Sequence, residues 1–204
     1  YSFGISDDTL SIYEVFTGEN SIEDVIVRKE GLDILPSNIR LSDIELSLHS
    51  TDNRTAILKE MLSSYRSKYD FIIIDCPPSK SLLSINALVA SEKVIATILL
   101  DVLSVQGLNH IIRTVSEIKE VLNNDLTFLG VLAVNVDMRK NISGEVIQFI
   151  KENFDVSLFK CYIRTNVKIA EAPSHGESVL KYASTSNGAK DYKSLAVEII
   201  KLNS

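Results

Sequence analysis

The stretch Tyr69–Asp75 reads Tyr-Asp-Phe-Ile-Ile-Ile-Asp, with a continuous apolar run between two aspartates. A strand with one face in water alternates apolar and polar residues. A strand of a parallel sheet is covered by helices on both faces and is apolar throughout. The run therefore predicts a strand buried inside a parallel sheet, and this constrains the fold more than any other stretch of the chain.

Strand-like and helical patterns alternate along the rest of the sequence. Further strands are predicted at 32–36, 93–100, 128–134 and 158–163. Helices are predicted at 9–16, after Ser21, at 41–65 with a break near 50–53, and at 81–90, 104–122, 144–153 and 189–202. Strands alternating with long helices indicate an α/β fold with a doubly wound, mostly parallel sheet flanked by helices. No repeat or linker interrupts the chain, so we expect a single domain over 1–204.

Composition and charge narrow the possible functions. The formal net charge is −6, which argues against a constitutive electrostatic grip on DNA, although a local basic patch stays possible. The longest apolar runs, such as Val94–Leu100, are too short to span a bilayer. Two cysteines and three histidines lack the spacing of a disulfide framework or a zinc site. We therefore expect a cytoplasmic protein with no membrane partner.

In a doubly wound sheet, ligands bind at the carboxyl ends of the strands. The segments expected there are 75–79, 101–106, 135–139 and 164–173. Asp75 would place a carboxylate beside phosphates, where magnesium and its waters bind. Pro77 and Pro78 stiffen the exit from the strand. An aspartate that only ends a buried strand is the alternative, and the Pro-Pro-Ser that follows favours the nucleotide site.

Two segments carry a family resemblance. Tyr69–Asn86 resembles the Walker B and switch II region of the ParA/Soj partitioning ATPases, which are relatives of MinD. Asn166–Gly176 is similar to the "NVRLSEAPSHG" segment of that family. Weaker similarities occur, in the order of the family, at Asn38, Val105–Leu108 and Gly188-Ala189 with Tyr192. The resemblance covers nearly the whole chain and implies a P-loop NTPase-like fold.

The resemblance implies a site and partners. It implies ATP and Mg²⁺ as cofactors, a homodimer around two nucleotides, nonspecific DNA and a ParB-type protein. It places Asp75 near magnesium, with water between them, makes Asn135 the residue that reads adenine, and adds Pro77, Arg164 and Thr165 to the nucleotide site. An amide offers the donor and the acceptor that adenine reading needs. Without the resemblance, Asn135 is as readily a turn residue at the end of a strand.

Departures from the family pattern bear on catalysis and DNA binding. No G-x-x-x-x-G-K-[ST] motif occurs in these residues, so we expect the N-terminal βαβ portion of the domain to be missing and assign no catalytic residue. The family's "I-P-R-N" is here Ile163-Arg164-Thr165-Asn166. The expected cationic patch comprises Arg164, Lys168, Lys181, Lys190 and Lys193. A solvated charged face is the alternative for these five residues.

The sequence leaves two functions open. The first is a ParA/Soj-like ATPase for chromosome or plasmid partitioning, which would associate with the nucleoid if DNA binding survives. This chain by itself should then not hydrolyse ATP, so whether it is an enzyme stays open. The second is a degenerate, non-hydrolysing relative that acts as a partner-binding or regulatory module. MinD-like membrane targeting is disfavoured, because the last helix is short and its pattern is typical of core docking.

Overall fold

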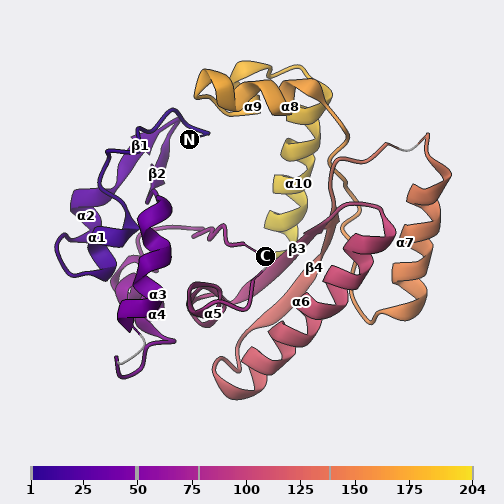
Figure 1. Ribbon diagram of the computed structural model, residues 1–204. Coiled ribbons are helices and arrows are strands. Elements are labelled where there is room, and N and C mark those ends of the chain that lie inside the picture. Colours follow the sequence, from indigo (N-terminus) through magenta and orange to yellow (C-terminus); the bar gives the residue numbers. More distant parts are fainter. Residues whose placement is uncertain (1, 49–50, 78, 138, 204) are drawn as a thin grey trace. The chain divides into compact units, whose positions relative to one another are not determined.

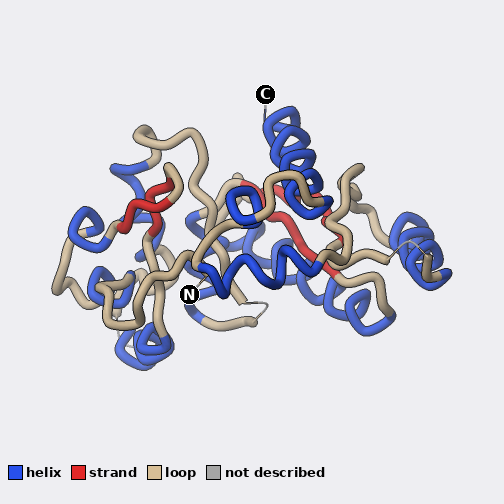
Figure 2. Tube along the Cα trace, turned by 90° about the horizontal axis from the view of Figure 1, so that it is seen from above, coloured by secondary structure: helices blue, strands red, loops and turns tan. Residues whose placement is uncertain are grey.

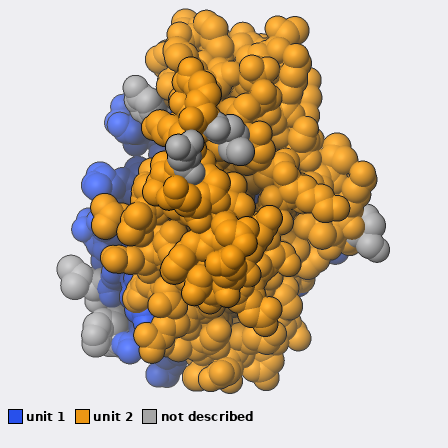
Figure 3. Space-filling model, turned by 90° about the vertical axis from the view of Figure 1, so that its right-hand side faces the viewer, with its two compact units in different colours: residues 1–91 blue, residues 92–204 orange. Residues whose placement is uncertain are grey.

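The computed structural model describes residues 2–48, 51–77, 79–137 and 139–203. The chain divides into two compact units, Tyr1–Ser91 (unit 1) and Glu92–Ser204 (unit 2), which Figure 3 colours separately. The expectation of a single domain over 1–204 stays a prediction.

Unit 1 begins with two short capped helices and a hairpin. Helix α1 spans Ile12–Phe16 and α2 spans Ile22–Val25. Ser11 and Ser21 each form a capping box with the acidic residue three positions later, Glu14 and Asp24, which satisfies backbone N–H groups at the helix start. The antiparallel strands β1 (Val27–Lys29) and β2 (Leu32–Ile34) follow, joined at Gly31, whose φ of 77° suits glycine. The predictions of the helix after Ser21 and of the strand at 32–36 are confirmed.

A helical region completes unit 1. It comprises η1 (Ile39–Asp43), α3 (Ile44–Ser47), α4 (Ile57–Leu62), η3 (Ser63–Tyr65) and α5 (Leu82–Ala90). Turns at 51–56 interrupt the predicted helix 41–65, while Ser50 lies outside the described residues. The fully buried Asn86 joins α5 to α4: its Oδ1 accepts the Leu58 N–H at 3.1 Å, and its Nδ2 donates to the Arg54 carbonyl at 2.8 Å.

The predicted strand Tyr69–Asp75 is wrong for this structure. No strand is assigned over 69–77, and the side chains of Phe71 and Ile73 are 49% and 90% exposed. A strand is defined by ladder hydrogen bonds to a neighbour, and none of the described strands pairs with this segment. The apolar pattern is therefore present without the pairing that would bury it.

Unit 2 contains a parallel pair of strands. Strand β3 (Lys93–Ile98) pairs with β4 (Thr127–Ala133), from Lys93 opposite Thr127 to Ile98 opposite Ala133, with one irregularity between Val94 and Ile95. The helices α6 (Val102–Val121) and α7 (Asn141–Asn153) supply Leu108, Val146 and Ile150 to the core that these strands form. The predicted parallel sheet and both crossover helices are confirmed (Figure 1).

The predicted strand 158–163 is only partly formed. The chain runs parallel to β4 but makes isolated bridges, Val131 with Leu158 and Val136 with Arg164, and no continuous ladder. The two backbones are close at Gly130, where an added Cβ would lie 3.0 Å from the Ser157 carbonyl oxygen. On its outer side this segment donates backbone N–H groups to Glu198 and Asp191 of helix α10.

Four helical elements close the chain. They are α8 (Val167–Glu171), η4 (Ala172–His175), α9 (Val179–Tyr182) and α10 (Asn187–Asn203). The predicted helix 189–202 is confirmed as α10, whereas α8, η4 and α9 were not predicted. Helix α10, which ends at the C label, lies on the other side of β3 and β4 from α6 (Figures 1 and 2).

Candidate functional site

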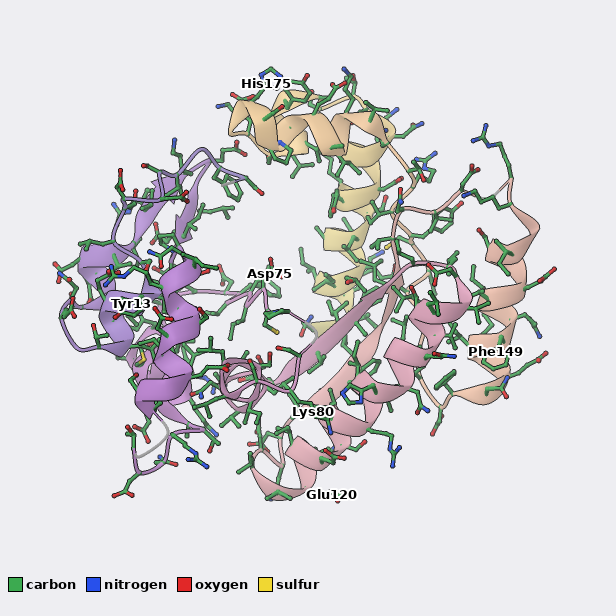
Figure 4. All side chains as sticks on the ribbon, in the orientation of Figure 1. Tyr13, Asp75, Lys80, Glu120, Phe149 and His175 are labelled. Carbon is green, nitrogen blue, oxygen red and sulfur yellow. The ribbon has the colours of Figure 1, made fainter. Side chains whose placement is uncertain are left out.

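Asp75 lies in unit 1, on the extended segment that follows the exposed apolar run (Figure 4). Its side chain is exposed, and no described hydrogen bond or ion pair engages its carboxylate. An unpaired carboxylate is a ligand that Mg²⁺ prefers. Burial, and then the charge of Asp75, raise the pKa of the neighbouring Cys76 thiol, which disfavours the reactive thiolate.

The turn after Asp75 is anchored to α5. The Pro77 carbonyl accepts the Ser79 N–H at 2.8 Å and the Ser84 hydroxyl at 3.2 Å. Ser81 caps α5 by accepting the Ser84 N–H at 3.3 Å. Pro78 lies outside the described residues. A proline with fixed φ, followed by a capped helix, gives Asp75 a stiff point of attachment.

Asn135 and Thr165 are brought together in unit 2. Asn135 follows β4 with a φ of 53°, and its carbonyl accepts the Thr165 hydroxyl at 3.0 Å. Asparagine tolerates this left-handed conformation better than most residues do. Its side chain is exposed, and no described hydrogen bond occupies the amide, which therefore keeps a donor and an acceptor for a ligand.

Arg164 is bound to α10. Its Nη2 and Nε donate to the two carboxylate oxygens of Asp191, at 2.6 and 3.0 Å, and its backbone N–H donates to Oδ2 at 3.0 Å. Asp191 is only 8% exposed. Burial pushes the pKa of Asp191 up, but hydrogen bonds and the charge of Arg164 outweigh this and lower it. Asp191 carries no motif in the sequence, and 27 positions separate it from Arg164, so sequence reasoning missed it.

A second ion pair, between Asp137 and Arg139, follows Asn135 in the chain. Asp137 accepts two hydrogen bonds of 2.8 Å from the Arg139 guanidinium. These bonds, followed by the Arg139 backbone N–H, lower the pKa of Asp137 to about 2. Both residues fall within the expected segment 135–139, but their pairing was not foreseen. The loop after β4 thus carries a carboxylate that is paired with Arg139, two positions after Asn135.

The five candidate cations for DNA do not form one uniform patch. Lys168 pairs with Glu171 at 2.7 Å, Lys181 pairs with Glu177 at 2.8 Å, and Arg164 pairs with Asp191. Lys190 and Lys193 are exposed on α10, and no ion pair is recorded for either among the described residues. Two of the five cations therefore keep their charge uncompensated, and both are on α10.

Around Lys168 the aromatic residues form a small network. The Tyr182 hydroxyl donates to Glu171 at 3.0 Å, and the His175 ring stacks on Tyr182 with the centroids 4.6 Å apart. His175 is labelled in Figure 4. This network joins the similarity segment Asn166–Gly176 to Tyr182 of α9.

The candidate site residues fall into two sets. Asp75 and Pro77 belong to unit 1, and Asn135, Arg164 and Thr165 belong to unit 2. Within the described residues no group of three His, Cys, Asp or Glu side chains is arranged to hold a metal ion. A magnesium ion at Asp75 would therefore take its remaining ligands from water and phosphate, as such ions usually do. None of the described helices is long and apolar enough to cross a membrane.

Comparison with known proteins finds relatives that agree with one another in their names. A family model described as an AAA domain matches residues 2–128. The chain is 37% identical over 190 residues to the sporulation initiation inhibitor protein Soj of Bacillus subtilis, covering 92% of this chain and 75% of Soj. It is 32% identical over 202 residues to the chromosome partitioning protein ParA of Myxococcus xanthus, covering 97% and 71% of the two chains.

Solved structures agree with these relatives. Cobyrinic acid a,c-diamide synthase of Mycobacterium smegmatis, with bound ADP and magnesium, is 28% identical with a TM-score of 0.84, covering 98% of this chain and 76% of the synthase. The cell division ATPase MinD of Pyrococcus furiosus, at 24% identity and a TM-score of 0.79, covers 98% and 79% and supports the fold alone. The chain therefore has the α/β P-loop NTPase fold and belongs to the ParA/Soj family of partitioning ATPases.

Proposed function

We propose that this chain supplies the nucleotide-binding domain of a partitioning ATPase, which binds ATP with magnesium, dimerises, binds DNA nonspecifically and responds to a ParB-type partner. The observation that carries the proposal is Asp75: an exposed carboxylate with no described partner, directly after an apolar run and before a turn anchored on α5. The names of the similar proteins support the partitioning role.

In this proposal each candidate residue has a separate task. Asp75 holds magnesium through water, and the ion neutralises charge on the phosphates. Asn135 binds the adenine edge with its free side-chain amide, and Thr165 holds the Asn135 backbone. Pro77 restricts the turn beside the phosphates.

The phosphates need a cradle of backbone N–H groups, and the 204 residues contain no motif of that kind. The exposed apolar segment 71–74 suggests where such a phosphate-binding loop would lie. A strand that carries a phosphate-binding loop would pair with this segment and bring it into a sheet, which would place the loop next to Asp75. The proposal therefore requires a phosphate-binding loop in the full-length protein.

DNA binding is proposed to centre on α10. Lys190 and Lys193 are exposed there and carry no recorded ion pair among the described residues. Phosphate neutralisation by lysine releases counterions and makes affinity fall with salt. Lys168 and Lys181, which are already paired with carboxylates, would contribute less to this dependence.

The test is equilibrium binding of ATP to the full-length protein, with and without Mg²⁺. We expect Asp75→Asn to weaken Mg²⁺-dependent ATP binding by about tenfold or more, the loss expected when a charged ligand is removed. Asp70→Asn is the matched control, because Asp70 is an exposed aspartate at the other end of the same apolar run, and it should leave binding unchanged.

A full-length protein that bound no ATP would overturn the proposal. It would favour the second function, a non-hydrolysing relative that binds a protein partner. One observation favours that second function: three of the five candidate cations are already paired with carboxylates.

A further inference from the structure

The turn after β4 is held in a conformation that most residues avoid. Asn135 has a φ of 53°, in the left-handed region that non-glycine residues seldom adopt and asparagine adopts more readily than most. Its carbonyl accepts the Thr165 hydroxyl at 3.0 Å. The next residue, Val136, donates its N–H to the Ile163 carbonyl at 2.9 Å and accepts the Thr165 N–H at 3.1 Å. The segment 163–165 therefore holds the turn.

That segment is itself held from helix α10. On its outer side, the Asp191 carboxylate accepts the Arg164 N–H at 3.0 Å and binds the Arg164 guanidinium through two nitrogens. Seven residues further along α10, Glu198 accepts the N–H groups of Lys160 and Cys161 at 2.7 and 3.0 Å. A spacing of seven places both acids on one face of the helix. The two carboxylates thus accept backbone N–H groups that would otherwise face a neighbouring strand.

The two anchors act on different parts of the segment. Glu198 holds residues 160 and 161, before the chain reaches the Asn135 turn, whereas Asp191 holds Arg164, next to Thr165. Within the ion pair, the Asp191 side chain is the more buried partner: it is 10% exposed, whereas the Arg164 side chain is 42% exposed. Hydrogen bonds to a buried charged group are worth more than those at the surface, and removing the charge leaves its donors unpaired.

We propose that Asp191 is a positioning residue for the base-binding end of the nucleotide site: it fixes Arg164, and through Thr165 it keeps Asn135 in the left-handed conformation that leaves its amide free. Arg164 then serves as the link between α10 and the turn and contacts neither nucleotide nor DNA. The nucleotide half of this inference rests on the proposed function; the conformational half stands on the hydrogen bonds alone.

Amide hydrogen exchange in the full-length protein tests the conformational half. Asp191→Ala should speed exchange of the Val136 and Thr165 amides by about tenfold, because one charged hydrogen-bond acceptor is lost. Arg164→Ala should have a smaller effect, since the backbone N–H at 164 still reaches Asp191. Glu198→Ala is the matched control on the same helix face, and it should speed exchange at Lys160 and Cys161 only. Unchanged exchange at Val136 and Thr165 in Asp191→Ala would overturn the proposal.

Competition binding with ATP, GTP and inorganic tripolyphosphate tests the nucleotide half. We expect Asp191→Ala to lower ATP affinity by roughly tenfold and to erase the preference for ATP over GTP, while tripolyphosphate binding is unchanged. Asp191→Asn keeps an oxygen for the Arg164 N–H, so it should fall between the wild type and Asp191→Ala, and it also guards against a misfolded alanine variant.

The outcomes separate the two proposals. If the wild type binds ATP and Asp191→Ala binds it equally well with the same base preference, the positioning role is overturned and the proposed function stands. If the wild type binds no ATP, the proposed function fails, and the hydrogen-exchange result alone supports or overturns the hold of Asp191 on the turn.

Discussion

Residues 71–74 and strand β3 have similar sequences and different structures. The first reads Phe-Ile-Ile-Ile, and β3 contains Val-Ile-Ala-Thr-Ile at 94–98. Ile73 is 90% exposed, whereas Ile98 is 4% exposed. The difference lies in the neighbours: β3 is hydrogen bonded to β4 and covered by α6, and no described strand pairs with 71–74. Strand propensity is thus realised only where a partner is present.

The largest expected effect concerns the core that covers β3. Leu108 on α6 is fully buried, so Leu108→Ala should lower the free energy of unfolding by about 2–5 kcal/mol. Leu103→Ala, on the same helix at 78% exposure, should change it by less than about 0.5 kcal/mol. Urea unfolding measures both. Equal losses would mean that α6 does not cover the strands as described.

The second prediction concerns the close approach of β4 to residues 157–159. Gly130→Ala would place a Cβ 3.0 Å from the Ser157 carbonyl oxygen and 3.2 Å from the Phe159 ring, so it should cost about 1–3 kcal/mol. Gly107→Ala, in α6 with open space around the new Cβ, should instead stabilise the protein by up to about 1 kcal/mol. A Gly130→Ala variant as stable as the wild type would show that the 157–159 segment is not packed on β4.

The third prediction is an acid sensitivity of the outer edge of the 157–165 segment. The pKa values of Asp191 and Glu198 are lowered in the folded protein: burial opposes ionisation, but the hydrogen bonds from Arg164, and from Lys160 and Cys161, outweigh it. Each carboxylate therefore contributes stability above its ordinary pKa, roughly 4, and loses it as the pH falls through the lower folded value. The slope of stability against pH in acid should be smaller in Asp191→Asn. An unchanged slope would contradict the linkage.

The smallest expected effect is at the unpaired segment. Ile73→Thr should change the stability of this chain by less than about 0.5 kcal/mol, because the side chain is already exposed. Thermal unfolding of the variant beside the wild type measures it. A loss comparable to that of Leu108→Ala would show that Ile73 is buried in solution.

Local sequence patterns predict the elements whose formation depends on neighbouring residues. The cap at Ser21 with Asp24 and helix α6 follow from residues within one or two turns of each other. The predicted strands 93–100 and 128–134 formed because each is the pairing partner of the other. The strand 69–75 failed because a ladder depends on a partner that no residue of the segment reveals. The segment 158–163 makes only isolated bridges beside β4, and its outer side is bound by the carboxylates of Glu198 and Asp191, which lie far along the chain on α10.

The candidate site could be predicted from the sequence only where it depends on local patterns. Asp75 and Asn135 were expected at the ends of apolar runs, and both have exposed side chains without described partners. Arg164 was expected as a ligand residue because it follows a predicted strand. Its pairing with Asp191, 27 positions away, depends on how α10 docks on the segment, and neither periodicity nor a motif encodes that.

The most direct test of this comparison is amide hydrogen exchange at residues 72–74, set beside residues 96–98 of β3, in this chain. The unpaired state of residues 72–74 predicts nearly unprotected exchange in the first set, and exchange slower by about a hundredfold or more in the second, where ladder hydrogen bonds must open. Equal, strong protection of both sets would contradict it, because residues 72–74 would then be paired in a sheet.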